Sequence, residues 1–173
     1  MIQDSQFSSN INYHAEHLLG IDDGAFPSFV KIKKKTFKTL LVGVLLTNMK
    51  LEWIGSELIT VDGNEATDII IKIVKKSPIK PDIIFLSGIS FAGFNIADPF
   101  KINNNLNIPI IIVVDRKPSM SSIKDALMKH FPDWENRWKI IEKTQPLIEI
   151  KQTEKSKPIY SYSLGLNDYL TIE

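Results

Sequence analysis

The sequence has no cysteine, only two arginines, and no apolar run long enough to cross a membrane. The lack of cysteine excludes disulfides, thiolate metal sites and a thiol nucleophile. A membrane helix needs about 18 or more consecutive apolar residues, and the first twenty residues lack the basic-then-apolar layout of a secretory signal. We therefore expect a soluble cytoplasmic protein that has no membrane partner.

Net charge is also nearly absent, because 21 basic residues face 20 acidic ones and leave a formal charge of +1. So small a net charge creates no global field that would attract nucleic acid, so a phosphate-binding site has to be local. Lys33, Lys34 and Lys35 form one local basic cluster. A solvated loop is the first interpretation of this cluster, and contact with a nucleic-acid backbone is the alternative.

What the chain does have is enough apolar content, 43% of 173 residues, to bury one core. We expect a loose segment over residues 1–16 and a single domain over 17–173. The apolar pattern predicts three strands, near residues 17–22, 39–47 and 51–61, and the short turns between them favour an antiparallel meander. Apolar residues at helical spacing then predict a helix within 62–77.

The second half of the chain reads as alternating strand and helix. Residues 83–86 are wholly apolar, which is typical of a parallel strand covered on both faces. The elements expected after it are a short, irregular segment at 91–107 that forms a short helix or a loop, a buried strand at 108–115, helices at 119–131 and 133–144, and a hairpin of 146–152 with 158–164. This order predicts a ribonuclease H-like fold: a mixed five-stranded sheet flanked by helices, with an added C-terminal hairpin.

Polar side chains follow the predicted strands at the ends where ligands collect in open sheets. These residues are Asp22 and Asp23, Asp62, Ser87, and Asp115. Neighbouring strands lie about 4.8 Å apart, so carboxylates at adjacent ends can share one or two divalent cations. Oxygen ligands favour Mg²⁺ or Mn²⁺, and the matching chemistry is phosphodiester hydrolysis.

Each aspartate also has a purely structural interpretation. Asp22 and Asp23 precede Gly24 and could form an Asx-type turn. Asp62 could cap the following helix, with Glu65 completing a capping box. Asp115 could form a surface ion pair with Arg116. Spacing alone leaves these alternatives open.

Five segments together resemble a known family: "GIDDGAF", "TVDGNEATDIIIK", "GISFAGFN", "VVDRKPSMSSIKDAL" and "ENRW", in this order between about residues 20 and 150. They resemble the archaeal domain-of-unknown-function family numbered ninety-nine. That family is similar to endonuclease V, a magnesium-dependent nuclease with a ribonuclease H-like fold that cuts near deaminated bases, usually inosine. The resemblance implies an Mg²⁺- or Mn²⁺-dependent endonuclease whose partner is nucleic acid.

The nuclease's functional residues can be carried over by position. Its first aspartate falls on Asp22, its glutamate near Asp62, and its lysine near Arg116 or Lys117. The segment "GIS" resembles the nuclease loop that shapes the base pocket. The resemblance therefore implies nucleic-acid contacts for Arg116 and for residues of this loop, namely Gly88, Ser90, Phe91, Phe94 and Asn95. For the two phenylalanines, packing in the core is the first interpretation, and stacking of one of them on a base is the alternative.

One position departs from the family pattern, because the strand that usually ends in Asp-Gly ends here in Ser87-Gly88. A hydroxyl binds Mg²⁺ weakly and removes a negative charge from the site. Metal binding would then rest on Asp22, Asp23 and Asp62, with Asp115 as a substitute. Two hypotheses follow: a nuclease with Asp22, Asp62, Ser87 and Lys117 as catalytic residues, or a catalytically degenerate relative that binds nucleic acid or a protein.

Overall fold

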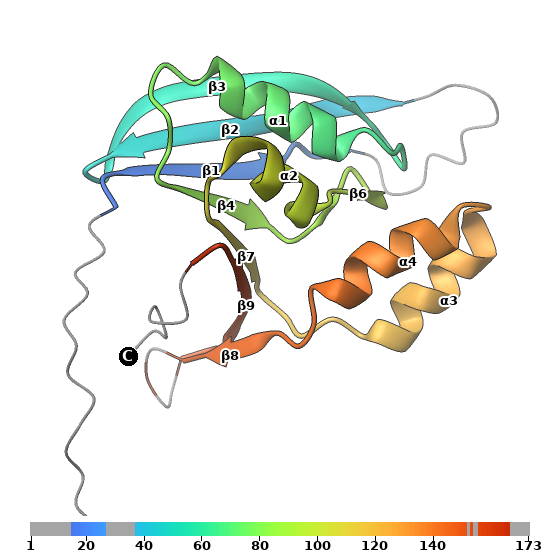
Figure 1. Ribbon diagram of the computed structural model, residues 1–173. Helices are drawn as coiled ribbons and strands as arrows, with labels where there is room; N and C mark the ends of the chain where they lie inside the picture. Colours follow the sequence, from blue (N-terminus) through green and yellow to red (C-terminus); the bar gives the residue numbers. More distant parts are fainter. Residues whose placement is uncertain (1–14, 27–36, 152, 154–155, 167–173) are drawn as a thin grey trace, which may run out of the picture.

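The computed structural model describes residues 15–26, 37–151, 153 and 156–166. Its centre is a seven-stranded sheet in the order β3-β2-β1-β4-β7-β9-β8 (Figure 1). Strands β1 (His17–Asp23), β2 (Lys38–Thr47) and β3 (Lys50–Thr60) form the predicted antiparallel meander. The lysine cluster at Lys33, Lys34 and Lys35 lies outside the described residues, as does most of the segment expected to be loose.

The parallel part of the sheet lies at its middle. β4 (Ile83–Ser87) runs parallel to β1 on one side and to β7 (Ile110–Val114) on the other. β9 (Ile159–Leu164) pairs antiparallel with β7, and β8 (Ile148–Ile150) pairs with β9. The predicted mixed sheet is confirmed, and the C-terminal hairpin extends it to seven strands by pairing with β7.

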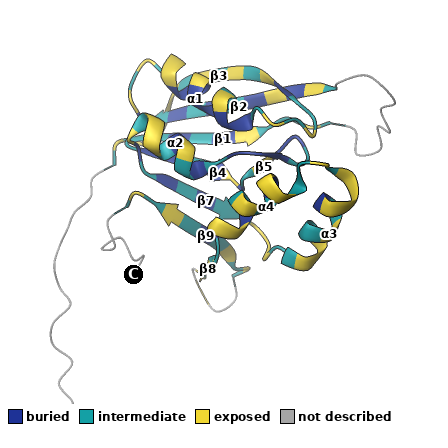
Figure 2. Ribbon diagram, turned by 45° about the vertical axis from the view of Figure 1, so that its right-hand side comes forward, coloured by how far each residue is buried: buried dark blue, intermediate teal, exposed yellow. Residues whose placement is uncertain are grey.

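Helices α1 (Ala66–Lys76) and α2 (Pro99–Leu106) cover one face of this sheet (Figures 1 and 2). The apolar stripe of α1 faces the strands, so Ile70 and Ile73 are fully buried against a core that includes Leu19 and Ile84. Burying such a side chain stabilises the fold by about 1.5–3 kcal/mol relative to leaving it exposed. The core therefore fixes β1 and β4, the two strands whose ends carry candidate site residues.

The segment 91–107, expected as a short helix or a loop, contains a helix and also a hairpin that the sequence does not predict. It holds a hairpin of β5 (Ser90–Phe91) and β6 (Asn95–Ile96), followed by α2. Asp98 caps α2 by accepting hydrogen bonds from the amides of Phe100 and Lys101, and Pro99 occupies the first turn. An aspartate followed by proline is a helix-start signal, and it accounts for this helix.

The last two helices form a separate pair beyond the carboxyl end of β4. Helices α3 (Met120–His130) and α4 (Trp134–Lys143) lie where the sequence predicts them. Leu127 and Ile141 are buried between them and pack against Ile96 of the β5–β6 hairpin. This second apolar cluster attaches the helix pair to the hairpin. None of the described helices is long and apolar enough to span a membrane.

The opposite face of the sheet carries none of the helices in the described part of the chain (Figure 2). Phe85 of β4 faces this open side and is only half-buried. The prediction that β4 is covered on both faces is therefore wrong, because the described helices cover only one of them. Side chains alternate along a strand. Ile21 therefore points into the core, and Asp22 points to the open face.

Candidate functional site

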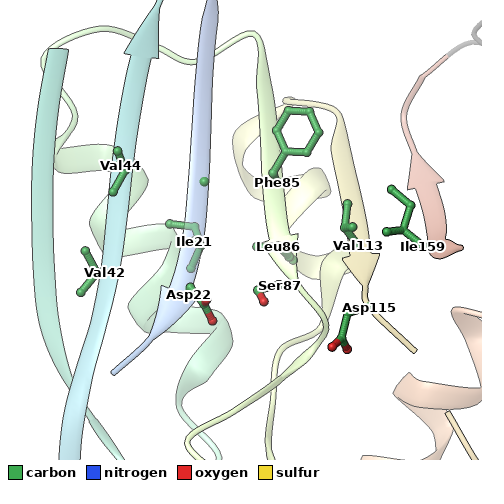
Figure 3. Close-up of a pocket in the computed structure, with 11 residues that line it drawn as sticks. Ile21, Asp22, Val42, Val44, Phe85, Leu86, Ser87, Val113, Asp115 and Ile159 are labelled. Carbon is green, nitrogen blue, oxygen red and sulfur yellow. The ribbon is translucent and has the colours of Figure 1, made fainter. Parts of the chain in front are cut away.

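A hollow of about 510 Å³ lies on the open face and ends at the carboxyl ends of three strands (Figure 3). Asp22 of β1, Ser87 of β4 and Asp115 after β7 line this end. The β1–β4 register pairs Ile21 with Leu86, so Asp22 and Ser87 are the next residues along neighbouring strands. The structure thus brings together three of the predicted site residues.

Each of the two carboxylates of the hollow contacts the residue that follows it in the sequence. An Oδ1 atom of Asp22 accepts a hydrogen bond of 2.9 Å from the amide of Asp23. Asp115 is 84% exposed, and its contact with Nε of Arg116 is 3.5 Å long, which is the surface ion pair of the structural interpretation. Such an exposed pair contributes about 0–1 kcal/mol, so it leaves the Asp115 carboxylate available to a ligand.

The Asp23 carboxylate, unlike that of Asp22, holds the turn between β5 and β6. Its Oδ2 atom accepts a 2.7 Å hydrogen bond from the amide of Ala92, in the turn between β5 and β6. Burial raises the pKa of Asp23, and the nearby charge of Asp22 raises it further, against the lowering effect of the Ala92 amide. The Asp23 carboxylate thus lies close enough to Asp22 for the two groups to interact, although Asp23 does not line the hollow.

Asp62 also holds the β5–β6 hairpin. Its Oδ1 atom accepts a 2.9 Å hydrogen bond from the amide of Phe94, and a Cβ added to Gly93 would lie 2.3 Å from that oxygen. The capping-box prediction for Asp62 is wrong, because α1 begins after Glu65 and has no side-chain cap. The structure does not bring the Asp62 carboxylate into the hollow that Asp22 lines.

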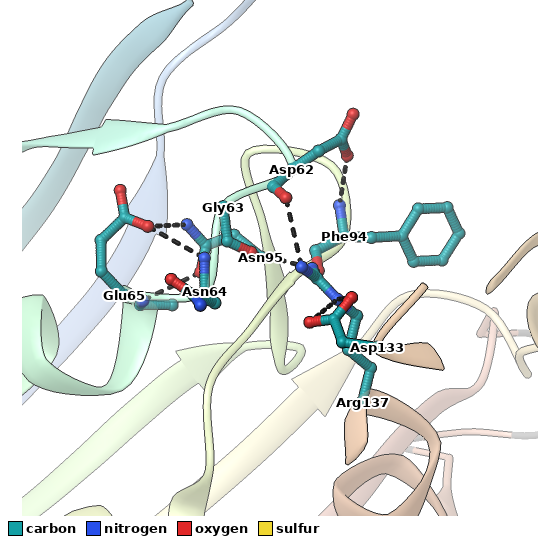
Figure 4. A network of polar contacts seen from close by, with 9 residues as sticks. Asp62, Gly63, Asn64, Glu65, Phe94, Asn95, Asp133 and Arg137 are labelled. Carbon is teal, nitrogen blue, oxygen red and sulfur yellow. Dashed lines mark hydrogen bonds and ion pairs between the residues drawn. The ribbon is translucent and has the colours of Figure 1, made fainter. Parts of the chain in front are cut away.

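The half-buried Glu65 and the buried Asn95 form the centre of this region (Figure 4). The Glu65 carboxylate accepts hydrogen bonds from the amides of Thr60 at 2.8 Å and Asn64 at 2.9 Å. Asn95, which is 0% exposed, accepts from the amide of Ala66 and donates to the Thr60 carbonyl and to Glu65. Burial raises the pKa of Glu65, but the donated hydrogen bonds outweigh it and lower that pKa below its usual value.

A second cavity, of about 290 Å³, lies between the hairpin loop and the helix pair. Its lining is mainly apolar: Ile89 and Phe94 form one wall, and Ile123 of α3 and Ile141 of α4 form another. Ser87 borders both this cavity and the open hollow. The end of β4 therefore separates a polar edge from an apolar pocket.

The remaining predicted residues are divided between surface and interior. Phe91 is 0% exposed and packs in the core, in agreement with the first interpretation of it. The oxygen and the nitrogen of the Asn95 side-chain amide both form hydrogen bonds inside the fold. Gly88, with a φ of +78°, lines the pocket. Ser90 lines it too, and its hydroxyl donates to the Gly93 carbonyl. Arg116 and Lys117 are exposed after β7.

Arg137 was not singled out from the sequence, yet it is the most buried charged residue in the region. It is 8% exposed and donates to backbone carbonyls of Gly63 and Phe94 while pairing with Asp133 (Figure 4). The signal for it was present, because it is one of only two arginines and lies in the segment "ENRW".

The donor set at the end of the hollow suits one hydrated hard cation. Mg²⁺ keeps several waters and commonly binds through one or two carboxylates together with substrate phosphates. Asp22 and Asp115 offer such carboxylates, and Ser87 offers a hydroxyl. No group of three or more Asp, Glu, His or Cys residues gathers around a common point within the described residues. Of the one or two cations that the sequence predicts, the residues at this edge suit one.

Comparison with known proteins agrees with this architecture. A protein of unknown function from Archaeoglobus fulgidus DSM 4304 superposes with a TM-score of 0.72 at 30% identity, covering 88% of this chain and 80% of that one. Human ENDOV superposes with a TM-score of 0.50 at 13% identity, covering 86% and 69% of the two chains. The second likeness concerns the fold alone, and it confirms the predicted ribonuclease H-like fold.

Sequence comparison identifies the family. UPF0215 protein TK2033 of Thermococcus kodakarensis is 38% identical to this chain over 159 residues, which are 90% of the chain and 78% of the relative. Residues 14–171 match the family described as endonuclease dU. Because this match spans most of the sequence, the chain belongs to the endonuclease dU family.

Proposed function

We propose that this protein is a metal-dependent endonuclease that cuts nucleic acid beside a deaminated base. One observation carries the proposal: Asp22, Ser87 and Asp115 end three neighbouring parallel strands on one face, and Ser87 also borders a small apolar pocket. The arrangement offers a polar edge for a phosphate and an enclosed site for a base. The description of the family as endonuclease dU supports both parts.

At the polar edge, Asp22 and Asp115 are the residues that would hold Mg²⁺ or Mn²⁺, which supplies charge neutralisation at the phosphate and lowers the pKa of a bound water. Ser87 lies between them and can orient a water through its hydroxyl. Lys117 and Arg116 follow directly after β7, where a cationic side chain can steady the phosphate. Asp62 contributes indirectly, because its carboxylate holds the amide of Phe94.

The pocket beside Ser87 suits a single base. Its volume of about 290 Å³ lies at the lower end of the range of about 300–1,000 Å³ for small-molecule sites. Enzymes that act at one base swing it out of the stack into an apolar, aromatic-lined pocket, at the least cost when the base is damaged. Phe94 supplies the aromatic wall here. The family description points to deoxyuridine, and the endonuclease V resemblance points to inosine.

A second candidate function is a binding module that has lost catalysis. Ser87 favours it, because the serine replaces a carboxylate and the described residues gather no third acid at the edge. Such a protein would keep the pocket and bind nucleic acid without cutting it. A protein partner on the same surface is the other form of this alternative.

The decisive experiment is cleavage of end-labelled single strands, DNA and RNA, that carry one central deoxyuridine or one inosine. Wild type, Asp22→Ala and Asp68→Ala are compared in Mg²⁺ and then in Mn²⁺. Asp68 is an exposed aspartate on α1, paired with Lys101 and remote from the hollow, so its variant controls for the loss of one negative charge.

Cuts beside the modified base that disappear in Asp22→Ala and persist in Asp68→Ala are the expected result. Absence of cutting in both metals contradicts the nuclease proposal. In that case a binding measurement with the same strands separates the alternatives: selective binding supports the catalytically degenerate nucleic-acid module, and no binding redirects the search to proteins.

A further inference from the structure

We infer that Arg137 is a positioning residue that sets where the α3–α4 pair lies against the β5–β6 hairpin, and thereby sets the selectivity of the pocket between them. The link to selectivity rests on the proposed function. The positioning itself does not. Both parts follow from the contacts of one buried guanidinium group.

Arg137 joins three segments that are far apart in the chain. Nη1 donates to the carbonyl of Gly63 at 2.8 Å, in the turn before α1, and also to the carbonyl of Phe94 in the hairpin. Nε lies 3.1 Å from both carboxylate oxygens of Asp133, at the start of α4. One side chain on α4 therefore contacts the β3–α1 turn, the hairpin and its own helix start.

A guanidinium group is suited to this arrangement because it presents several donors in a fixed plane, whereas the ammonium of lysine is a compact point charge. The side chain is 9% exposed, so its charge depends on these partners for compensation. Phe131, in the α3–α4 connection, adds a ring whose centroid lies 4.4 Å from the guanidinium carbon. Because these contacts are directional, they favour one orientation of α4 against the hairpin, whereas a charge attraction alone would allow many.

The same contacts reach the pocket wall. Phe94, whose carbonyl Arg137 binds, lines the pocket and packs edge-on against Phe131 at 5.5 Å between ring centroids. The opposite wall comes from Ile123 of α3 and Ile141 of α4. A shift of the helix pair relative to Phe94 changes the distance between the two walls. Selectivity for a base of a given shape depends on that distance.

The first test is binding of fluorescent single-stranded DNA carrying one deoxyuridine or, as the reference, thymidine, in EDTA so that no strand is cut. Arg137→Lys keeps the charge but loses the planar fork. Lys139→Met removes an exposed charge from the same helix and is the control. Asp133→Asn is a second variant, which weakens the orientation of Arg137 without removing it. Melting temperatures establish that each variant is folded.

The expected result is that Arg137→Lys lowers the preference for deoxyuridine over thymidine by about tenfold or to unity, with affinity for the thymidine strand within about twofold of wild type. Asp133→Asn lowers the preference in the same direction, and Lys139→Met leaves it unchanged. An unaltered preference in folded Arg137→Lys overturns the selectivity role. A variant in which both affinities fall equally also overturns it, since that pattern indicates general loss of structure.

Hydrogen exchange separates this inference from the proposed function. In Arg137→Lys, amides of the hairpin segment 90–97 are expected to exchange at least tenfold faster, while those of β1 and β2 keep their wild-type rates. Unchanged exchange in 90–97 overturns the positioning role. If wild type shows no preference for deoxyuridine or inosine, the proposed function fails, and the exchange result still decides whether Arg137 positions the helix pair.

Discussion

The carboxylate of Asp23 accepts a 2.7 Å hydrogen bond from the amide of Ala92, which lies 69 positions later in the chain. Ala92 has a φ of 45° and Gly93 a φ of 86°, so the turn between β5 and β6 adopts a backbone conformation that most residues avoid. Asp23 and Asp62 hold this turn from two sides. Two acids that sequence reasoning assigned to metal binding thus shape the loop that borders the pocket.

Replacing Asp23 tests which of its properties matters. Burial raises its pKa above the usual 3.8, so the folded state holds the proton more tightly than the unfolded state does. Ionisation then lowers stability as pH rises through the raised folded-state pKa. Asp23→Asn can keep an acceptor for Ala92 and removes the charge, so thermal unfolding at pH 7 should show equal or higher stability than wild type.

The companion variant Asp23→Ala leaves the buried Ala92 amide without its acceptor, which costs about 1–3 kcal/mol. At pH 7, Asp23→Ala should therefore lower the melting temperature, whereas Asp23→Asn should leave it unchanged or raise it. Equal destabilisation by both would contradict the burial of an unfavourable charge at this position.

Glu65 should show the opposite pH dependence. Hydrogen bonds lower its pKa despite burial, so its contribution to stability is present above the usual value of 4.5 and is lost as pH falls through the lowered folded-state value. Glu65→Gln replaces one accepting oxygen with a donor and should cost about 1–3 kcal/mol at pH 7, with a smaller cost at pH 3. Urea unfolding at the two pH values measures the difference.

Glu57→Gln is the control for that experiment. Its carboxylate also has a lowered pKa, because Lys76 and Lys72 donate to it, but the pairs lie at the surface. Exposed pairs contribute little, so the control should change stability far less than Glu65→Gln. A cost in the control that matches the cost at Glu65 would argue against a special role for the buried network.

Asn95→Ala is expected to be strongly destabilising. The substitution removes the acceptor of the Ala66 amide and the donor to the Thr60 carbonyl, and each stranded buried group costs about 1–3 kcal/mol. Asn105→Ala removes a single bond to the Lys101 carbonyl on exposed α2 and provides the comparison. Equilibrium unfolding in denaturant should give a cost for Asn95→Ala several times that for Asn105→Ala.

Ser87→Asp tests the proposed cation site between Asp22 and Asp115 directly. A third carboxylate between Asp22 and Asp115 should destabilise the metal-free protein by charge repulsion and strengthen binding of Mn²⁺. A tenfold gain in affinity adds about 1.4 kcal/mol of stability at saturating metal, visible as a larger rise in melting temperature.

Ser56→Asp is the matched control, because Ser56 is an exposed serine paired with Val42, which in turn pairs with Asp22 on the same face. Ser56→Asp adds the same charge on β3, two strands from Asp22 and three strands from Ser87. A response to Mn²⁺ that is equal in the two variants would indicate nonspecific attraction and count against a metal site at Ser87.

Most elements of the fold could be predicted because their signals are local. The apolar run at 83–86 identifies β4, and the helical spacing of Ala66, Ile70 and Val74 identifies α1. The hairpin at 90–96 was missed because two-residue strands have no periodicity to detect. For the segment of α2 the sequence predicts a short helix or a loop, although Asp98 and Pro99 mark the start of a helix.

The sequence by itself determined that Asp22, Ser87 and Asp115 follow apolar strand segments, because an apolar run and the polar residue after it are local signals. The order of the strands in the sheet, which makes the three strands neighbours and brings these side chains to one hollow, is a property of the whole fold. Only the tertiary structure decided that the carboxylates of Asp23 and Asp62 hold the β5–β6 hairpin. It also decided that Arg137 reaches Gly63, 74 positions earlier. Hydrogen bonds between such distant residues depend on how whole elements pack, and no local pattern encodes that packing.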